Sequence, residues 1–269
     1  MLGFIQAIHG TVTAPEPYSA YHIISVVIIV TVTILLCLLF RDASYKGFAA
    51  IILSFWAVMV VMEIVKQFYN SYLPDPEPHF EYAWGSFPFQ LCSTPLYTLP
   101  IVAFSAKKKN ALFDAFASYT AIFPFFGGLL VLINPSSVFN EFLYTNVQTM
   151  VHHGSQVITG VYIAVWCRKR YNIKFFAKGV YVFAAGIAIA LVLNLAVHSF
   201  FKGYFNMFYI SPYFYDDVPT FGDLFKDLPY ALIASGYIAA VVLAGYLIYL
   251  AEKLSFSRFC EKKPSVNKA

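Results

Sequence analysis

The chain has little charge, and it has no polar stretch long enough to form a separate soluble domain. Asp, Glu, Lys and Arg together make up 12% of its 269 residues, against roughly 25% in a soluble globular domain. Hydrophobic residues make up 59%. This composition argues against an ordinary soluble enzyme, and it predicts one membrane-embedded domain over residues 1–269.

Cysteine is also scarce, and the four cysteines do not suggest a disulfide framework. Cys37 and Cys92 fall inside apolar stretches, whereas Cys167 and Cys260 fall in segments expected to face a reducing cytoplasm. We expect no cleavable signal peptide, because the first 20 residues lack a basic start and carry prolines where an apolar core is required.

Long apolar sequence, by contrast, is abundant. Each of seven stretches is long enough, at about 1.5 Å per helical residue, to cross a hydrocarbon layer of about 30 Å. These stretches cover residues 22–40, 48–70, 86–105, 111–133, 141–166, 179–201 and 229–250. The predicted fold class is therefore all-α, a polytopic membrane protein with seven transmembrane helices.

Positive charge is confined to alternate gaps between these stretches. Fifteen of the 18 Lys and Arg residues lie around Arg41 and Lys46, in 107–109, in 168–178 and in the tail 251–269. Because Lys and Arg are retained on the cytoplasmic side, the C-terminus is predicted inside and the N-terminal segment 1–21 outside, in the plasma membrane. The scattered charge argues against binding to nucleic acid, and anionic lipid headgroups are the expected partners of these loops.

Two connections are predicted on the outer side, at 71–85 and 202–228. The first contains three prolines near its start and is expected to be extended. The second is the longest connection and is rich in aromatic residues, so we expect it to fold against the helix ends. Long loops in small proteins are often functional, and this one is a candidate cover for a site.

Polar side chains inside the apolar stretches are costly in hydrocarbon, and for that reason they mark a candidate site. Counting along each helix places them all in the outer half of the bilayer. They are Glu63, Gln90, Cys92, Gln148, His152, His153, Gln156, Asn194 and His198. A cysteine, histidines, a carboxylate and amides in one layer are the components of nucleophilic catalysis.

Each of these residues also has a purely structural interpretation. Gln148, His152 and Gln156 recur every four residues, a spacing that also suits interhelical hydrogen bonds. Glu63 could simply pair with Lys66, three residues along the same helix. A cysteine within the membrane is most often a small apolar filler.

Three motifs resemble those of the YwaF-like bacterial integral membrane proteins. Residues 87–93, Phe-Pro-Phe-Gln-Leu-Cys-Ser, resemble the "LPxHLC" helix of that family. Residues 127–130, Gly-Gly-Leu-Leu, and residues 204–208, Tyr-Phe-Asn-Met-Phe, resemble two further family motifs. The similarity extends from about Glu63 to Pro212.

This resemblance implies a lipid-handling protein. Eukaryotic relatives of the family include a cysteine-dependent acyltransferase that makes polyunsaturated ether phospholipids, and more distant relatives are the androgen-induced multi-pass hydrolases of fatty-acid esters. The resemblance places the family cysteine on Cys92 and the family histidine on His153. This chain departs from the pattern at Gln90, where relatives commonly have histidine, so a base must come from His153 or His152.

We therefore predict a lipid acyltransferase or acyl hydrolase that needs no metal or cofactor. His153 would take the proton from Cys92, Glu63 would orient the histidine, and Gln90 or Asn194 would donate to the oxyanion. The phospholipid or other fatty-acyl substrate would contact the remaining polar residues, together with Asn206 of the third motif. These residues are Gln148, His152, Gln156 and His198.

Two other classes stay open. The protein could be a transporter or binding protein whose polar cavity recognises a headgroup or small molecule without chemistry. It could also be a metallohydrolase that uses His152, His153 and His198 with Glu63. An ion pump is disfavoured because the inner half has no acidic path, and a retinal protein because residues 229–250 contain no lysine. The oligomeric state is left open.

Overall fold

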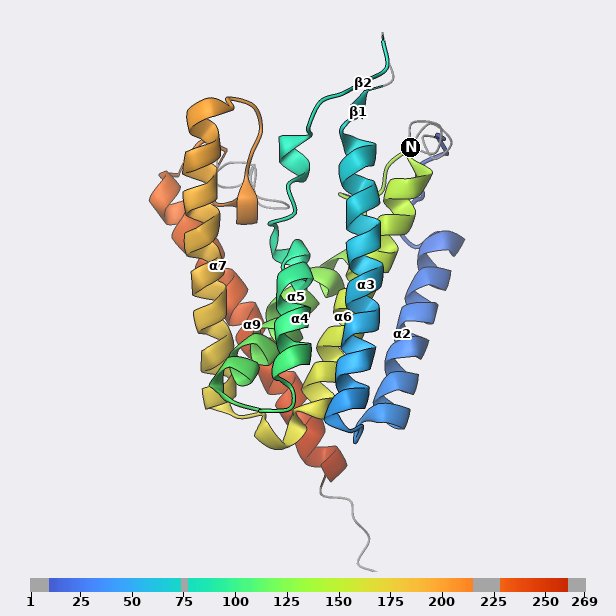
Figure 1. The fold of residues 1–269 in the computed structure, drawn as a ribbon, viewed down its shortest axis with the longest axis vertical. Coiled ribbons are helices and arrows are strands. Elements are labelled where there is room, and N and C mark those ends of the chain that lie inside the picture. The colour runs from blue at the N-terminus through green and yellow to red at the C-terminus, as the bar shows by residue number, and fades with distance from the viewer. Residues whose placement is uncertain (1–9, 74–76, 215–227, 261–269) are drawn as a thin grey trace, which may run out of the picture.

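The computed structural model describes residues 10–73, 77–214 and 228–260. In this part of the chain, seven α-helices form one bundle (Figure 1). They are α2 (Ala20–Phe40), α3 (Tyr45–Asn70), α4 (Pro95–Ser105), α5 (Ala111–Ile133), α6 (Leu143–Trp166), α7 (Ile173–Phe200) and α9 (Tyr230–Cys260). Short 3₁₀ turns are η1 (Trp84–Ser86), η2 (Leu91–Ser93), η3 (Arg168–Arg170) and η4 (Met207–Tyr209).

Five of these helices, α2, α3, α5, α7 and α9, are long and apolar enough to cross a membrane. The prediction of an all-α membrane protein is therefore supported by the length and composition of its helices. The other two helices, α4 and α6, fall outside that description for different reasons. With 11 residues, α4 reaches only about 16 Å at 1.5 Å per residue, whereas α6 is long but polar.

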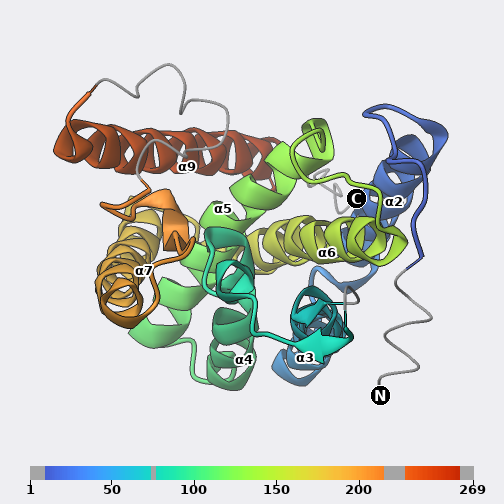
Figure 2. The ribbon, with the colours of Figure 1, turned by 90° about the horizontal axis from the view of Figure 1, so that it is seen from above.

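The polarity of α6 is explained by its position at the centre of the bundle. It packs against α5, α2 and α3, which surround it in the view from above (Figure 2). Two of its glycines allow this close approach: a Cβ on Gly154 would lie 2.6 Å from Ile29 of α2, and one on Gly160 would lie 2.7 Å from Phe125 of α5. Because neighbouring helices cover α6, its polar side chains face protein rather than lipid.

The peripheral helix α2 shows the opposite pattern. Apart from His22, Ile29 and Thr33, which are buried, most of its side chains are partly or fully exposed. Most of the exposed ones are aliphatic, and Leu39, for example, is 71% exposed. Such a surface is stable only in contact with lipid or another apolar partner.

The prediction of a helix over 86–105 is wrong in its first half. The chain is extended at Gln90 and then forms the single turn η2 before α4 begins at Pro95. Proline lacks an N–H and fits the first turn of a helix, but it disrupts a helix interior. Pro88 and Pro95 therefore limit the regular helix to Pro95–Ser105.

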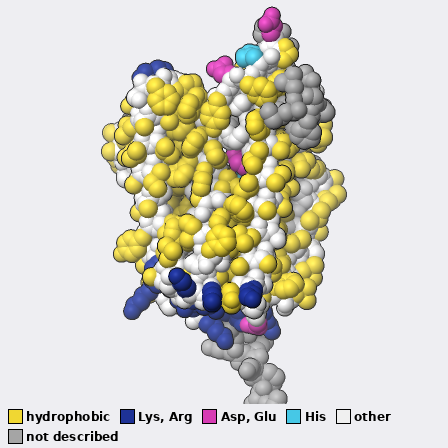
Figure 3. Space-filling model, viewed as in Figure 1, with side chains coloured by type: hydrophobic (Ala, Val, Ile, Leu, Met, Phe, Trp, Pro, Cys, Tyr) yellow, Lys and Arg dark blue, Asp and Glu magenta, His cyan; other side chains and the backbone are white. Residues whose placement is uncertain are grey.

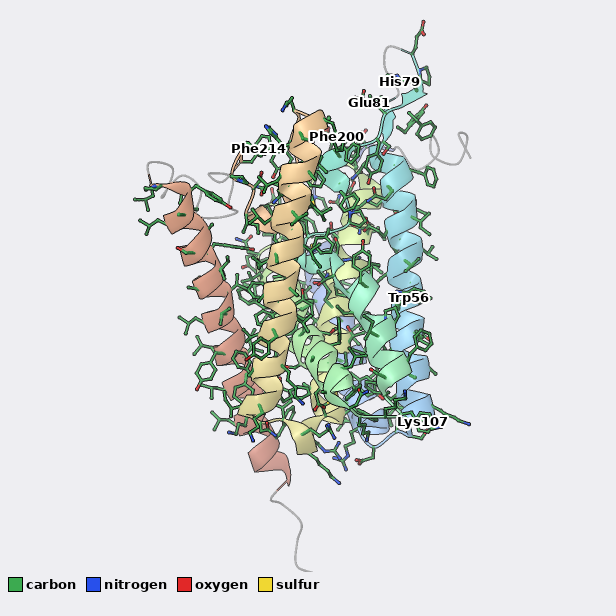
Figure 4. All side chains as sticks on the ribbon, turned by 60° about the vertical axis from the view of Figure 1, so that its left-hand side comes forward. Trp56, His79, Glu81, Lys107, Phe200 and Phe214 are labelled. Atoms are coloured by element: carbon green, nitrogen blue, oxygen red, sulfur yellow. The ribbon has the colours of Figure 1, made fainter. Side chains whose placement is uncertain are left out.

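The loops after α2, α4 and α6 lie together at one end of the bundle, which we call the basic end. Arg168 donates to the carbonyl of Arg41 at 2.9 Å, and Arg170 donates to that of Lys109 at 2.7 Å. Lys and Arg side chains gather at this end, and the sides of the bundle are apolar (Figure 3). In Figure 4, Lys107 lies far from Phe200, which is at the other end.

The described parts of the two long connections behave as expected. Strands β1 (Tyr72–Leu73) and β2 (His79–Phe80) pair antiparallel, so the proline-containing segment is extended on both sides. In the second connection, residues 205–208 are folded into the bundle with exposures of 1% or less. Residues 74–76 and 215–227, like 1–9 and 261–269, lie outside the described part of the chain.

Candidate functional site

Cys92 lies in the interrupted segment between the extended chain and α4. Irregular backbone within an apolar stretch needs hydrogen-bond partners from the protein, because lipid supplies none. Three side chains meet this need: Tyr97 donates to the carbonyl of Pro88 at 2.9 Å, Thr94 to that of Leu91 at 2.7 Å, and Trp56 to that of Leu96 at 2.8 Å. Trp56 reaches α4 from the neighbouring α3 (Figure 4).

The carbonyl of Cys92 itself is held by two side chains of α6. His152 Nε2 lies 2.9 Å from this oxygen, and Gln156 Nε2 donates to it at 2.6 Å. These two residues are four apart and share one face of the helix. The structure thus brings three of the predicted site residues together, through the main chain of Cys92 rather than through its thiol.

This arrangement fixes the tautomers of both histidines. A carbonyl oxygen can only accept, so Nε2 of His152 carries a proton, and in the neutral ring Nδ1 is the unprotonated nitrogen. Nδ1 of His153 lies 2.8 Å from the carbonyl of Thr149, which leaves its Nε2 unprotonated. The two rings are 5.8 Å apart. Among the described residues, no hydrogen bond joins Cys92 Sγ to either ring.

Glu63 does not orient a histidine in this structure. Its Oε1 accepts from Lys66 at 2.8 Å and from Gln67 at 2.6 Å, and the side chain is almost fully buried. The expected interaction between a carboxylate and His153 is replaced by the carbonyl of Thr149.

Gln90 and Asn194 hold the main chain of residues 206–208. Gln90 donates to the carbonyl of Asn206 at 2.7 Å and accepts from the N–H of Phe208 at 2.8 Å. Asn194 donates to the carbonyl of Met207 at 3.0 Å and accepts from its N–H at 2.7 Å. The oxygen and one N–H of each amide are therefore engaged by the main chain of residues 206–208.

Asn206 also stabilises the fold of this segment through hydrogen bonds. It donates to the carbonyl of Phe214 at 2.7 Å and accepts from the N–H of Ser211 at 2.9 Å. The next residues are unusual, since Phe208 and Tyr209 have positive φ angles of 56° and 55°. This conformation is costly for residues other than glycine and is kept where the surroundings impose it. Here the hydrogen bonds from Gln90 and Asn194 to residues 206–208 impose it.

His198 lies apart from the Cys92 region. Its ring stacks on Tyr213 with a centroid separation of 3.5 Å, and Lys202 donates to its carbonyl at 2.9 Å. No group of three His, Cys, Asp or Glu residues in the described ranges could hold a metal ion. The four residues that the metallohydrolase hypothesis requires are thus not brought together.

Several buried polar atoms near Cys92 have no partner in the described chain. They are Glu63 Oε2, His152 Nδ1 and Gln156 Oε1. The amide of Gln148 makes no hydrogen bond with the described residues either, although this residue is only 6% exposed. Buried polar groups are rarely left unpaired in proteins. These atoms are consequently available to bind water or a polar group of a ligand.

The sequence analysis did not predict two contacts in this region. The carbonyl of Thr149 orients His153, a contact that could have been predicted because Thr149 lies four residues earlier on the same helix. The segment around Phe208 reaches Gln90 across 118 residues of sequence, and no local signal predicts that contact.

Comparison with known proteins identifies the family of this chain. The model of the TMEM164 family matches residues 17–249, a range that includes every candidate residue described above. No curated protein and no solved structure matches the chain. Since the family match covers most of the sequence, the chain belongs to the TMEM164 family of multi-pass membrane proteins.

Proposed function

We propose that the protein is a membrane-embedded lipid acyltransferase or acyl hydrolase in which Cys92 is the nucleophile. The observation that carries this proposal is the interrupted helix, where Cys92 is held against His152 and Gln156 of the central helix. Interrupted helices within membrane bundles are frequent places for binding sites. A thiol beside histidines is a pair suited to nucleophilic catalysis.

The two histidines have different roles in this proposal. His152 is a positioning residue, because its protonated nitrogen is occupied by the carbonyl of Cys92. His153 is the base, because its Nε2 is unprotonated and its other nitrogen is oriented by Thr149. A nucleophile, a base and a group that orients the base are the general elements of such sites. The thiol and His153 must approach when lipid binds, as catalytic hydrogen bonds often tighten only in the complex.

The chemistry follows from these roles. His153 accepts the thiol proton, and the sulfur of Cys92 attacks the carbonyl carbon of a lipid ester. The ester C–O bond breaks, the leaving alcohol takes the proton from His153, and the acyl group remains on Cys92 as a thioester. A lysolipid hydroxyl or water then attacks the thioester, with His153 again accepting a proton, and the thiol is restored.

The position of Cys92 favours the thiolate in this apolar setting. Cys92 lies in the first turn of the helical segment formed by η2 and α4, where main-chain N–H groups lack intrahelical acceptors and the helix dipole favours negative charge. The N–H groups of Leu91 and Cys92 replace Gln90 and Asn194 as the proposed oxyanion donors.

The choice of an acyl lipid as substrate rests on the resemblance to YwaF-like proteins and their cysteine-dependent relatives. The surroundings of the site agree with it, because the site lies among helices whose outer surfaces are apolar (Figure 3). The unpaired Glu63 Oε2, together with the Gln148 amide, would bind the polar part of such a lipid.

We also propose seven membrane crossings, with the basic end in the cytoplasm and the Cys92 region nearer the outer surface of the plasma membrane. This orientation is supported by the clustering of the three basic loops and by the positive-inside rule. An impermeant thiol reagent on intact cells should label His79→Cys and leave Lys108→Cys unlabelled. The reverse pattern would contradict the orientation.

Acyl exchange between a phospholipid and a lysolipid, with purified protein in detergent or nanodiscs, tests the enzymatic proposal. Cys92→Ala should abolish the activity, whereas Cys37→Ala, a control in α2, should retain it. His153→Gln should lower the rate by about 10²–10⁴-fold, the usual contribution of a general base. Unchanged exchange in Cys92→Ala would refute the mechanism and leave a transporter or binding protein as the better explanation.

His152→Gln separates positioning from catalysis. Glutamine keeps an N–H donor that can reach the carbonyl of Cys92 but cannot act as a base near neutral pH. If His152 only positions the turn, this variant should retain most of the activity, and His152→Leu should lose both activity and thermal stability. Loss of activity in His152→Gln with an unchanged melting temperature would instead identify His152 as the base.

A further inference from the structure

A hollow of about 330 Å³ lies at the basic end, between the start of α5 and the start of α7. Four cationic side chains and one acidic side chain line it, namely Lys169, Arg170, Lys174, Lys178 and Asp114. It is separate from the Cys92 region, because α4 leads from Cys92 to the loop at this end (Figure 1). Neither the proposed chemistry nor the family match assigns it a role.

Asp114 fixes two of the four cations. Its Oδ1 accepts from Nε and Nη2 of Arg170 at 2.9 and 2.7 Å, and its Oδ2 accepts from Lys178 at 2.7 Å. The contact between the helices is tight here, since a Cβ on Gly179 would lie 2.5 Å from Ser118. Arg170 and Lys178 are thus held in place at the wall of the hollow by a single carboxylate.

The other two cations, Lys169 and Lys174, are both exposed, and neither forms an ion pair with a described residue. Lys169 also lines the neighbouring hollow that contains Asp42. With one acid against four cations, the hollow carries an excess of three positive charges. Like charges so close together repel one another, and this arrangement favours an anionic ligand.

We propose that this hollow binds a phosphomonoester group, such as the terminal phosphate of an anionic lipid headgroup. A phosphomonoester carries a charge between −1.5 and −2 near neutral pH and three strong acceptor oxygens. Guanidinium and ammonium groups are the donors that bind phosphate in proteins. The volume is at the small end of the range of about 300–1,000 Å³ for ligand pockets, which suits a headgroup.

The location favours a lipid as the source of the phosphate. The hollow lies where α5 and α7 begin, and both helices are long and apolar enough to cross a membrane, so a headgroup bound there would be next to the apolar part of the bundle. Basic pockets between membrane helices are known places for phosphorylated headgroups. A soluble phosphate compound has the same binding chemistry, and the experiment must distinguish the two.

Binding of short-chain phosphatidic acid to the purified full-length protein in detergent, followed by thermophoresis, tests the proposal. Phosphatidylglycerol supplies the phosphodiester comparison, and inorganic phosphate supplies the free anion. The wild type should bind phosphatidic acid more tightly than phosphatidylglycerol. Lys169→Gln/Lys174→Gln should weaken this binding by about 30-fold, since each lysine near an anionic lipid surface contributes about fivefold.

The matched control is Lys46→Gln/Lys108→Gln, which removes the same charge from exposed lysines at the same end but outside the hollow. This control should keep wild-type affinity for phosphatidic acid. Equal losses in the two double variants would overturn the proposal, because they would show diffuse attraction to a basic surface. If inorganic phosphate competes at a concentration similar to that of phosphatidic acid, the site takes phosphate from a soluble source.

Discussion

The two ends of the bundle use polar side chains in opposite ways. Around Cys92, amides and imidazoles bond to main-chain groups that the interrupted segments leave unpaired, as His152 and Asn194 do, and the Glu63–Lys66 ion pair is largely buried. At the basic end, exposed charged side chains surround one carboxylate, Asp114. In apolar surroundings a polar side chain is tolerated where it completes the main chain, whereas at the interface charge can remain free for a ligand. Substitutions should therefore damage the fold at the first end and mainly affect binding at the second.

The largest effect on stability is expected from Glu63→Gln. Removing the carboxylate leaves the ammonium of Lys66 largely buried without its partner, and breaking a buried pair in this way typically costs about 3–5 kcal/mol. Thermal unfolding in detergent would measure the loss. The double variant Glu63→Gln/Lys66→Met, which removes both charges, should recover most of the stability. If the double variant is as unstable as the single one, the carboxylate stabilises the fold by some other contact.

A smaller loss, of about 1–3 kcal/mol, is expected for Asn194→Leu. This change leaves the N–H of Met207 buried without a partner, and one such group costs about 1–3 kcal/mol. The C=O of Met207 keeps a second donor, the N–H of Ile210, at 3.4 Å. Leu195→Ala, a change at an exposed neighbour on the same helix, is the control and should have little effect on unfolding. A melting temperature for Asn194→Leu equal to that of Leu195→Ala would show that the hydrogen bonds of Asn194 contribute nothing to stability.

Removing an acid at the basic end should lower the free energy of unfolding by less. Asp114→Asn leaves Arg170 and Lys178 without a carboxylate, but these two side chains are 38% and 36% exposed. Exposed ion pairs contribute only about 0–1 kcal/mol each. The affinity for phosphatidic acid, in contrast, should rise, because loss of the carboxylate increases the excess positive charge of the hollow from three to four. A loss of stability as large as that of Glu63→Gln would remove the contrast between the two ends.

The smallest effect concerns Asp42 and depends on pH. A hydrogen bond from Arg168, helped by the nearby positive charges, holds the pKa of the Asp42 carboxyl below its ordinary value. The stability contributed by this interaction is present above the ordinary value of about 3.9, and it is lost as the pH falls through the lowered pKa. Asp42→Asn should therefore melt slightly below the wild type at neutral pH, and the two should converge in strong acid. A difference that persists in acid would exclude titration of this carboxyl as the cause.

Much of the fold could be predicted because apolar length and charge placement are local properties of the sequence. The boundaries of α2, α5 and α6 lie within two residues of the predicted stretches. Pro88 and Pro95 in the first half of the stretch 86–105 also indicate an interruption, but the apolar composition around them favoured a continuous helix. α7 begins six residues early, because the side chain of Asn172 caps its first turn.

The site was harder to predict because its contacts join distant segments. The spacing of Gln148, His152 and Gln156 indicated a shared helix face, and two of these residues do meet Cys92. No sequence pattern indicated that Gln90 and Asn194 would be used by the main chain around Met207. That pairing depends on how residues 206–208 fold back into the bundle, which is a property of the tertiary structure.

Detection of an acyl thioester on Cys92 is the sharpest test of nucleophilic catalysis by this residue. The purified protein would be incubated with a phospholipid, quenched in acid and mapped by peptide mass spectrometry. We expect a mass increase equal to one acyl group on the peptide containing Cys92, removable by hydroxylamine and greatly reduced in His153→Gln. Acyl turnover without an adduct on Cys92, or an equal adduct on Cys37, would contradict it.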